Sequence, residues 1–234
     1  MIDFVKSIVH LIAEGNAFMI LNLCIGVFCL AVIAERFFVV FFRLRISDKD
    51  FLEAVEKQLT AGNMEKAVKL TQLAPNAPLS KVVKSALGAV RYGPEAVTSA
   101  IDEALLEVTP VIKKRIEMLW SLANVATLVG LIGTISGLIS AFKGISAADP
   151  ETKSKLLTLG ISEAMNNTAF GLLIAVTCIL AHMVLANATK KIGDGAEHGG
   201  VRLENILGRL RTQQNLRDKA GAPAAAAPAA PAPK

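Results

Sequence analysis

Residues 118–142 read MLWSLANVATLVGLIGTISGLISAF, a run of 25 positions without a charged side chain. About 20 apolar residues in a helix are enough to cross the hydrocarbon core of a bilayer, so this run is expected to be a transmembrane helix. Two other long apolar runs cover residues 17–42 and 159–189. With 53% hydrophobic and 19% charged residues, the chain is therefore expected to be an all-α integral membrane protein with three transmembrane helices.

Lysine and arginine are distributed unevenly around these helices. Segment 43–117 holds 12 of the 25 basic residues and the chain after residue 189 holds 8, whereas 1–16 holds one and 143–158 holds three. Basic residues concentrate on the cytoplasmic side of a membrane. We therefore expect the N-terminal segment and the 143–158 loop outside, and the 43–117 domain and the C-terminus in the cytoplasm. The basic excess is thus interpreted as a topology signal and not as a sign of nucleic-acid binding.

The cytoplasmic insert 43–117 is expected to be helical. Glycine and proline divide it into short helices, and the last of these has no strong stop before residue 118. A long helix should therefore pass from the cytoplasm into the membrane. Pro110 would sit inside this helix, which predicts a kink or a local break there.

The chain after the third apolar run has two parts. Residues 190–219 are expected to form a cytoplasmic helical tail that begins with a glycine-rich joint at 193–200. Residues 220–234 are almost pure Ala and Pro, which predicts a disordered tail and not a domain.

The third apolar run contains one ionisable residue, Glu163, followed by Asn166, Asn167 and Thr168. A charge at the centre of a transmembrane helix costs about 2.5 to 3.5 kcal/mol on insertion scales, and such residues mark ion pathways. The alternative is that the second and third helices merely pack together, with Glu163 hydrogen-bonded in a dry interface. Packing needs small residues but no carboxylate, which favours a functional role for Glu163.

The second apolar run carries small residues at three- and four-residue intervals. One face of that helix therefore bears no side chain larger than threonine, and such faces let helices approach closely in lipid. Glu35 and Arg36 lie near the inner end of the first run, where adjacent opposite charges can reach the interface, and are expected to be inner-interface anchors. The expected helix-packing seam consists of Thr127, Gly130, Thr134, Gly137 and Ala141.

The sequence gives no indication of an enzyme, a cofactor or a metal site. Its three histidines, His10, His182 and His198, lie in separate segments without the paired spacing of metal ligands, and it contains no P-loop motif. Energy for any work would then come from an ion gradient, in which each charge moved releases about 2.3 kcal/mol per 100 mV.

The runs VGLIGTISGLISAF (129–142) and ISEAMNNTAFGLLIA (161–175) resemble the two signature helices of the MotA/TolQ/ExbB proton channel family. The layout of helices and connecting segments agrees as well, and the resemblance covers roughly residues 17–192. The 75 residues of the cytoplasmic insert are fewer than the torque-coupling region expected of a flagellar MotA, which favours the TolQ/ExbB branch.

This resemblance implies a protein of the bacterial inner membrane with a periplasmic N-terminus. It implies that five copies surround the transmembrane helices of two copies of a single-span TolR- or ExbD-like partner, whose membrane Asp carries the proton. By position, the pore-lining residues of the family fall on Thr134, Glu163 and Thr168. The family commonly has small apolar residues between that Glu and Thr, whereas this chain has Asn166 and Asn167, and we add Asn167 to the expected proton path.

The expected function is a proton-channel stator subunit that converts proton motive force into rotation of its partner. Such a motor would drive outer-membrane transport, envelope maintenance or gliding motility through a TonB- or TolA-like or gliding-machinery effector. The alternative from another class is a non-conducting membrane scaffold that recruits cytoplasmic partners, although a scaffold gains nothing from Glu163. A self-sufficient channel is disfavoured because the second helix has no carboxylate, and the lack of a recognisable sodium cage favours protons.

Overall fold

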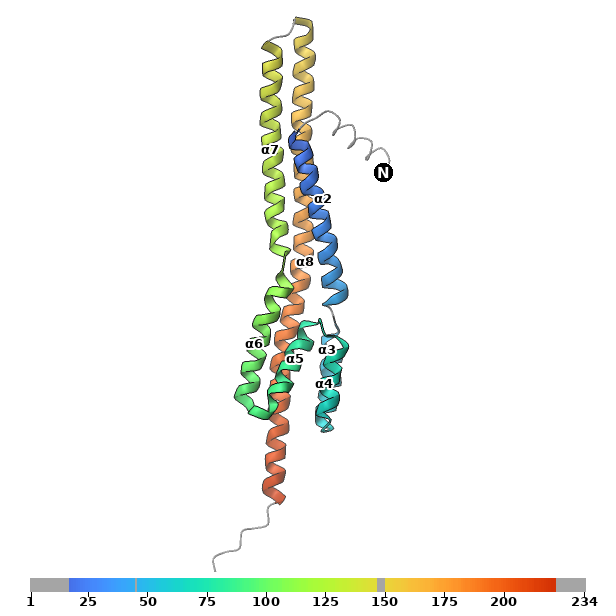
Figure 1. The fold of residues 1–234 in the computed structure, drawn as a ribbon, viewed down its shortest axis with the longest axis vertical. Coiled ribbons are helices and arrows are strands. Elements are labelled where there is room, and N and C mark those ends of the chain that lie inside the picture. The colour runs from blue at the N-terminus through green and yellow to red at the C-terminus, as the bar shows by residue number, and fades with distance from the viewer. Residues whose placement is uncertain (1–16, 45, 147–149, 222–234) are drawn as a thin grey trace, which may run out of the picture. The chain divides into compact units, whose positions relative to one another are not determined.

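The computed structural model describes residues 17–44, 46–146 and 150–221, which form helices and short connections (Figure 1). No strand occurs within these ranges, so the expected all-α fold is confirmed. The N-terminal segment 1–16 and residues 222–234 of the Ala/Pro tail lie outside the described residues. The elements are α2 (Ala17–Phe38), the π-helical turn η1 (Val39–Arg43), α3 (Asp48–Thr60), α4 (Met64–Leu73), α5 (Pro78–Ala89), the 3-10 turn η2 (Val90–Tyr92), α6 (Pro94–Lys113), α7 (Ile116–Ser146) and α8 (Pro150–Gly221).

The chain divides into two compact units. Among the described residues, the apolar unit is built from 17–43, 112–146 and 150–191, and the insert unit from 44, 46–111 and 192–221. Helix α8 contributes its first part to the apolar unit and its second part to the insert unit. Three helical stretches among the described residues are long and apolar enough to cross a membrane, and they lie within Ala17–Thr60, Pro94–Ile145 and Thr152–Leu216.

In the apolar unit, α2, α7 and the first part of α8 lie side by side (Figure 1). The packed face of α7 bears small residues at three- and four-residue intervals, while large apolar side chains such as Leu128, Leu131 and Ile135 are exposed. This distribution is typical of a membrane helix, which packs through small residues and turns its large apolar ones toward lipid. The buried positions of α7 are Ile116, Leu119, Ala123, Ala126, Gly130, Gly133, Gly137 and Ala141.

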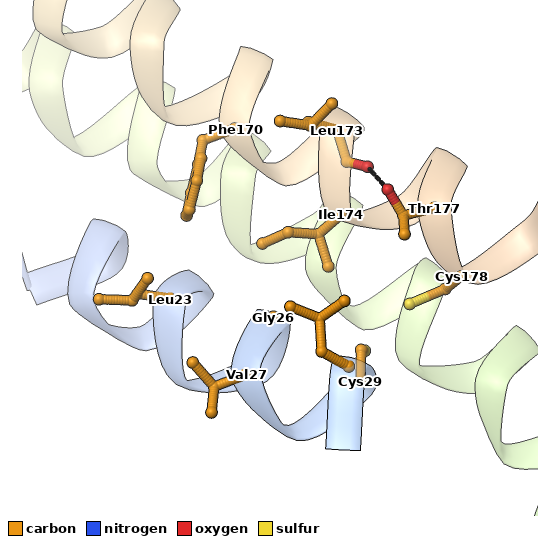
Figure 2. A pocket seen from close by; sticks show the side chains of 10 residues that line it. Leu23, Gly26, Val27, Cys29, Phe170, Leu173, Ile174, Thr177 and Cys178 are labelled. Carbon is orange, nitrogen blue, oxygen red and sulfur yellow. Dashed lines mark hydrogen bonds between the residues drawn. The ribbon is translucent and has the colours of Figure 1, made fainter. Parts of the chain in front are cut away.

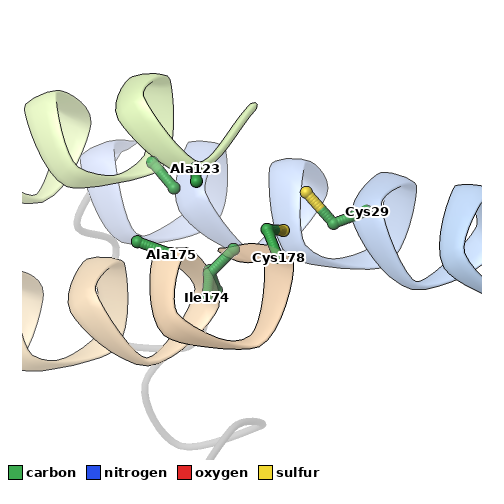
Figure 3. Close-up of a cluster of buried hydrophobic side chains, with 6 residues drawn as sticks. Cys29, Ala123, Ile174, Ala175 and Cys178 are labelled. Carbon is green, nitrogen blue, oxygen red and sulfur yellow. The ribbon is translucent and has the colours of Figure 1, made fainter. Parts of the chain in front are cut away.

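Where α2, α7 and α8 meet, a small buried core forms around two cysteines (Figure 3). Cys29 of α2 and Cys178 of α8 are both buried, and both are free thiols. They act as small packing residues, as expected for thiols inside apolar helices. The other members of this core are Ala123, Ala126, Ile174 and Ala175.

The insert unit is held together by amphipathic helices. The face of α3 predicted from its apolar spacing is buried through Leu52, Val55 and Leu59, and Gly62, at a φ of 76°, ends the turn that follows the helix. Helices α4 and α5 are linked by the buried hydroxyl of Ser80, which donates to the Thr71 carbonyl at 2.7 Å.

The prediction of a glycine-rich joint at 193–200 is wrong, because α8 continues through these residues without a break. Three of its glycines instead let other elements of the insert unit approach closely. Gly195 lies against the Asp48 carboxylate, Gly199 against the Leu79 side chain, and Gly200 against Ile101, 2.8 Å from the place of a Cβ atom. Close packing on this face outweighs the low helix propensity of glycine, which costs about 1 kcal/mol per residue.

Two connections differ from what the sequence predicted. Segment 143–158, expected as a loop, is largely helical, since α7 runs to Ser146 and α8 begins at Pro150; proline is well tolerated at the first position of a helix. Pro110 does not break its helix. The break between α6 and α7 lies at the following turn, where Arg115 adopts a φ of 61°.

Candidate functional site

The site is built on a stripe of glycines that brings α7 against α8. A Cβ atom on Gly130 would lie 3.1 Å from the Asn167 carbonyl oxygen, and one on Gly133 would lie 3.0 Å from the Asn167 Cβ. A Cβ atom on Gly137 would lie 3.1 Å from the Ala164 Cβ. Any larger residue at these positions would push the two backbones apart.

This arrangement alters the seam expected from the sequence. Gly130 and Gly137 lie in the interface, but Thr127 is only half-buried and donates its hydroxyl to the Ala123 carbonyl of its own helix at 3.0 Å. Gly133 was missed, although its spacing of three from Gly130 was a readable signal.

The close approach brings Thr134 of α7 and Thr168 of α8 into direct contact. Their hydroxyl groups are hydrogen-bonded to each other. Both hydroxyls also lie within reach of the Gly130 carbonyl oxygen, Thr134 at 3.2 Å and Thr168 at 3.3 Å, and Thr134 is 3.3 Å from the Ala164 carbonyl oxygen. We call these two side chains the threonine pair.

Each hydroxyl carries one proton, so the threonine pair has two hydrogen-bonded arrangements. In one, Thr134 donates to Thr168 and Thr168 donates to Gly130. In the other, Thr168 donates to Thr134, which donates to Gly130 or Ala164. Interchange of the two arrangements reverses a short chain of hydrogen bonds without moving a helix, which is the property a hydroxyl relay needs.

Asn167 and Glu163 lie only about 40° apart around an ideal helix, yet Asn167 is buried and Glu163 is exposed. The Asn167 side chain is 1% exposed and lies against Gly133, and neither of its amide atoms has a hydrogen-bond partner among the described residues. Such a buried amide costs about 1 to 3 kcal/mol. Glu163 is exposed, as expected for a residue about 140° around an ideal helix from Thr168. In the single chain, the four candidate proton-path residues therefore form a contacting pair, a buried neighbour and an exposed carboxylate.

Asn22 of α2 was missed by the sequence analysis and is 1% exposed at the same level. In the amide orientation that satisfies both neighbours, its nitrogen donates to the Ala126 carbonyl and its oxygen accepts from the Gly130 N–H, each at 3.2 Å. The available signal was an amide in the middle of an uncharged run, where polar side chains pair with another helix.

The expected anchors at the end of α2 are arranged differently from the prediction. Arg36 does not reach the surface, since it is 5% exposed and donates to the adjacent Glu35 at 3.3 Å. Glu35 is exposed and forms a second ion pair with Arg115, at the break between α6 and α7. A buried guanidinium is tolerated when a carboxylate accompanies it, and here the neighbouring Glu35 provides one.

A groove with an almost wholly apolar lining runs between α2 and α8, and none of the candidate proton-path residues lines it (Figure 2). Leu23 and Val27 of α2 and Phe170 and Ile174 of α8 are among the residues that line it. The hydroxyl of Thr177, which lines the groove, donates to the Leu173 carbonyl of its own helix at 2.8 Å. Among the described residues, no group of three His, Cys, Asp or Glu side chains lies close enough to hold a metal ion.

Residues 74–197, which include α7, the threonine pair and Glu163, match the sequence profile of the MotA/TolQ/ExbB proton channel family over more than half of the chain. The chain belongs to this family. Its helices and its relatives make it a multi-pass membrane protein of the TolQ/ExbB branch.

Relatives of this family member carry ExbB and TolQ names. It is 37% identical to the biopolymer transport protein exbB1 of Vibrio cholerae over 30% of this chain and 31% of that protein. It is 29% identical to the Tol-Pal system protein TolQ of Haemophilus influenzae over 49% of this chain and 44% of that protein. A putative ExbB homolog of Methanothermobacter thermautotrophicus is 23% identical over 75% of this chain and 61% of the relative. Each match thus spans less than two thirds of the relative.

Proposed function

We propose that this protein is the proton-channel stator subunit of an inner-membrane motor that converts proton motive force into mechanical work. The observation that carries the proposal is the threonine pair on the Gly130 carbonyl, within the segment that matches a proton channel family. Hydroxyl pairs also join helices in lipid, but this pair has two hydrogen-bonded arrangements and lies in the segment that matches a proton channel family, and both features support proton passage.

In this proposal, five copies surround the transmembrane helices of two copies of a single-span TolR- or ExbD-like partner with a membrane Asp. Protons from the periplasm reach that Asp along Thr134, Glu163, Asn167 and Thr168 and leave to the cytoplasm. Neutralising and recharging the Asp changes which of the surrounding subunits it prefers, and this bistable contact drives stepwise rotation. Each proton supplies about 2.3 kcal/mol per 100 mV.

The exposed position of Glu163 supports this assembly. A carboxylate on the outer surface of one apolar unit is costly against lipid, but it gains polar surroundings if that face lines a lumen between subunits. In this proposal the N-terminus lies in the periplasm and the C-terminus in the cytoplasm, which the concentration of basic residues in the insert and the tail supports. The process driven would be biopolymer import, envelope maintenance or gliding, through a TonB- or TolA-like or gliding-machinery effector.

The experiment that tests this function uses the full chain co-produced with a single-span, Asp-bearing TolR- or ExbD-like protein from the same organism. Native mass spectrometry gives the stoichiometry, and proton uptake into liposomes gives the flux. We expect a five-to-two complex in which Glu163→Ala lowers flux about tenfold or more without loss of assembly. The matched control is Glu65→Ala, which removes an exposed carboxylate from the insert unit. Unchanged flux in Glu163→Ala would overturn the proposal, and a chain that binds no such partner would support the scaffold alternative.

A further inference from the structure

Asn22 connects α2 to the backbone turn of α7 that supports the threonine pair. Its amide contacts both ends of one helical hydrogen bond, the Ala126 carbonyl and the Gly130 N–H, each at 3.2 Å. Gly130 is also the residue whose carbonyl lies 3.2 Å from Thr134 Oγ1 and 3.3 Å from Thr168 Oγ1. The Asn22 amide and the two hydroxyls therefore contact the same residue of α7, Gly130.

All three helices of the apolar unit converge at this point. A Cβ atom on Gly171 of α8 would lie 2.7 Å from the Ala126 carbonyl oxygen, 3.1 Å from the Gly130 Cα and 3.2 Å from the Asn22 amide. The Asn22 side chain is fully enclosed here, so no water competes for the two backbone groups that it binds. Because Gly130 has no side chain, α2 and α8 contact its backbone directly.

We propose that Asn22 is a positioning residue for the threonine pair, an inference that rests on the function proposed above. Its amide fixes the Ala126–Gly130 turn, and that turn sets the distance of the Gly130 carbonyl oxygen from both hydroxyls. Without the amide, this turn loses its contact with α2 and the Gly130 carbonyl can shift, which weakens the acceptor of the first arrangement and one of the two acceptors of the second. The relay then slows although the threonines themselves are intact.

The test compares proton flux in liposomes for the full chain in complex with its partner. Asn22→Leu keeps the shape of the side chain and removes both hydrogen bonds. We expect flux to fall about tenfold, with the complex assembling to the wild-type mass and melting at the same temperature. The matched control is Cys29→Ala, which shortens another buried side chain on the same face of α2 and lies seven residues from Asn22.

A double-mutant cycle separates positioning from a general structural role. If Asn22 acts through the threonine pair, Asn22→Leu should lower flux no further in a chain that already carries Thr134→Val and Thr168→Val. Full flux in Asn22→Leu, or an equal further loss in that background, would overturn the inference while leaving the proposed function standing. Wild-type flux in the double valine chain would instead overturn the proton path and the inference together.

A second pair of variants covers the case in which Asn22→Leu does not assemble. Asn22→Ser keeps a donor and an acceptor on a short side chain, whereas Asn22→Ala keeps neither. The serine chain should conduct several-fold faster than the alanine chain at equal yield of complex. Equal flux in the two would overturn the positioning role.

Discussion

Thr134 and Thr168 lie 34 positions apart in sequence and share a hydroxyl–hydroxyl hydrogen bond across the interface of α7 and α8. The contact exists because Gly130, Gly133 and Gly137 let the two backbones approach within van der Waals distance. The same closeness provides the Gly130 carbonyl as an acceptor for both hydroxyls.

Replacement of either threonine by valine keeps the side-chain volume nearly unchanged but removes a hydroxyl. Thr134→Val and Thr168→Val should each lower proton flux about tenfold in the partner complex, because the hydroxyl chain is interrupted. Thr127→Val is the control, since its hydroxyl bonds only to the Ala123 carbonyl of its own helix among the described contacts. Equal loss of flux in all three would contradict a specific relay.

Gly171→Ala should destabilise the apolar unit. The added methyl group would lie 2.7 Å from the Ala126 carbonyl oxygen and 3.1 Å from the Gly130 Cα, both backbone atoms that cannot swing aside. The expected loss is about 1 to 3 kcal/mol, measured as a lower melting temperature in detergent. Gly144→Ala, whose nearest neighbour is the Leu156 Cδ1 at 4.0 Å, should not lower it.

Glycines in the second part of α8 should respond in opposite directions to alanine. A methyl group on Gly200 would lie 2.8 Å from the Ile101 side chain, so Gly200→Ala should destabilise the insert unit by about 1 to 3 kcal/mol. Gly208 has no neighbour within 4 Å of that position, so Gly208→Ala should stabilise it by about 0.5 to 1 kcal/mol through helix propensity. Urea unfolding of the full chain in detergent measures the change in unfolding free energy for both variants. A stabilising Gly200→Ala would show that the glycine is not needed for packing.

Asp48 predicts a pH dependence of the insert unit. Burial raises the pKa of its carboxyl above the ordinary value of 3.8, so the folded chain binds this proton more tightly than the unfolded chain. The stabilisation contributed by the protonated Asp48 carboxyl is therefore fully present below pH 3.8. It is lost as pH rises through the pKa of the folded state.

Asp48→Asn should remove this loss. Its stability relative to wild type should increase as pH rises from about 3 toward neutrality, as measured by thermal unfolding at a series of pH values. Asp50→Asn, in the same helical turn, controls for the loss of a charge near the start of α3. A difference between Asp48→Asn and wild type that does not change with pH would refute the prediction.

The candidate site could be predicted only in part. Glu163 stood out because a carboxylate in an apolar run is costly wherever it lies, and the small residues of 118–142 indicated a packed face. Asn167 and Thr168 are adjacent in sequence, yet one is buried against Gly133 without a partner and the other bonds to Thr134. Helical spacing gives relative angles around one axis but does not say which angle faces a neighbour.

The sequence by itself determined the three apolar helices, the helical insert and the buried face of α3, because local periodicity and hydropathy fix these features. Only the tertiary structure decided the continuous course of α8 through its glycines, the burial of Arg36 and the convergence of Asn22 on Gly130. The first and the last of these depend on atoms from elements distant in sequence. Their contacts outweigh local preferences because a close helix interface sums many small packing and hydrogen-bond terms at once.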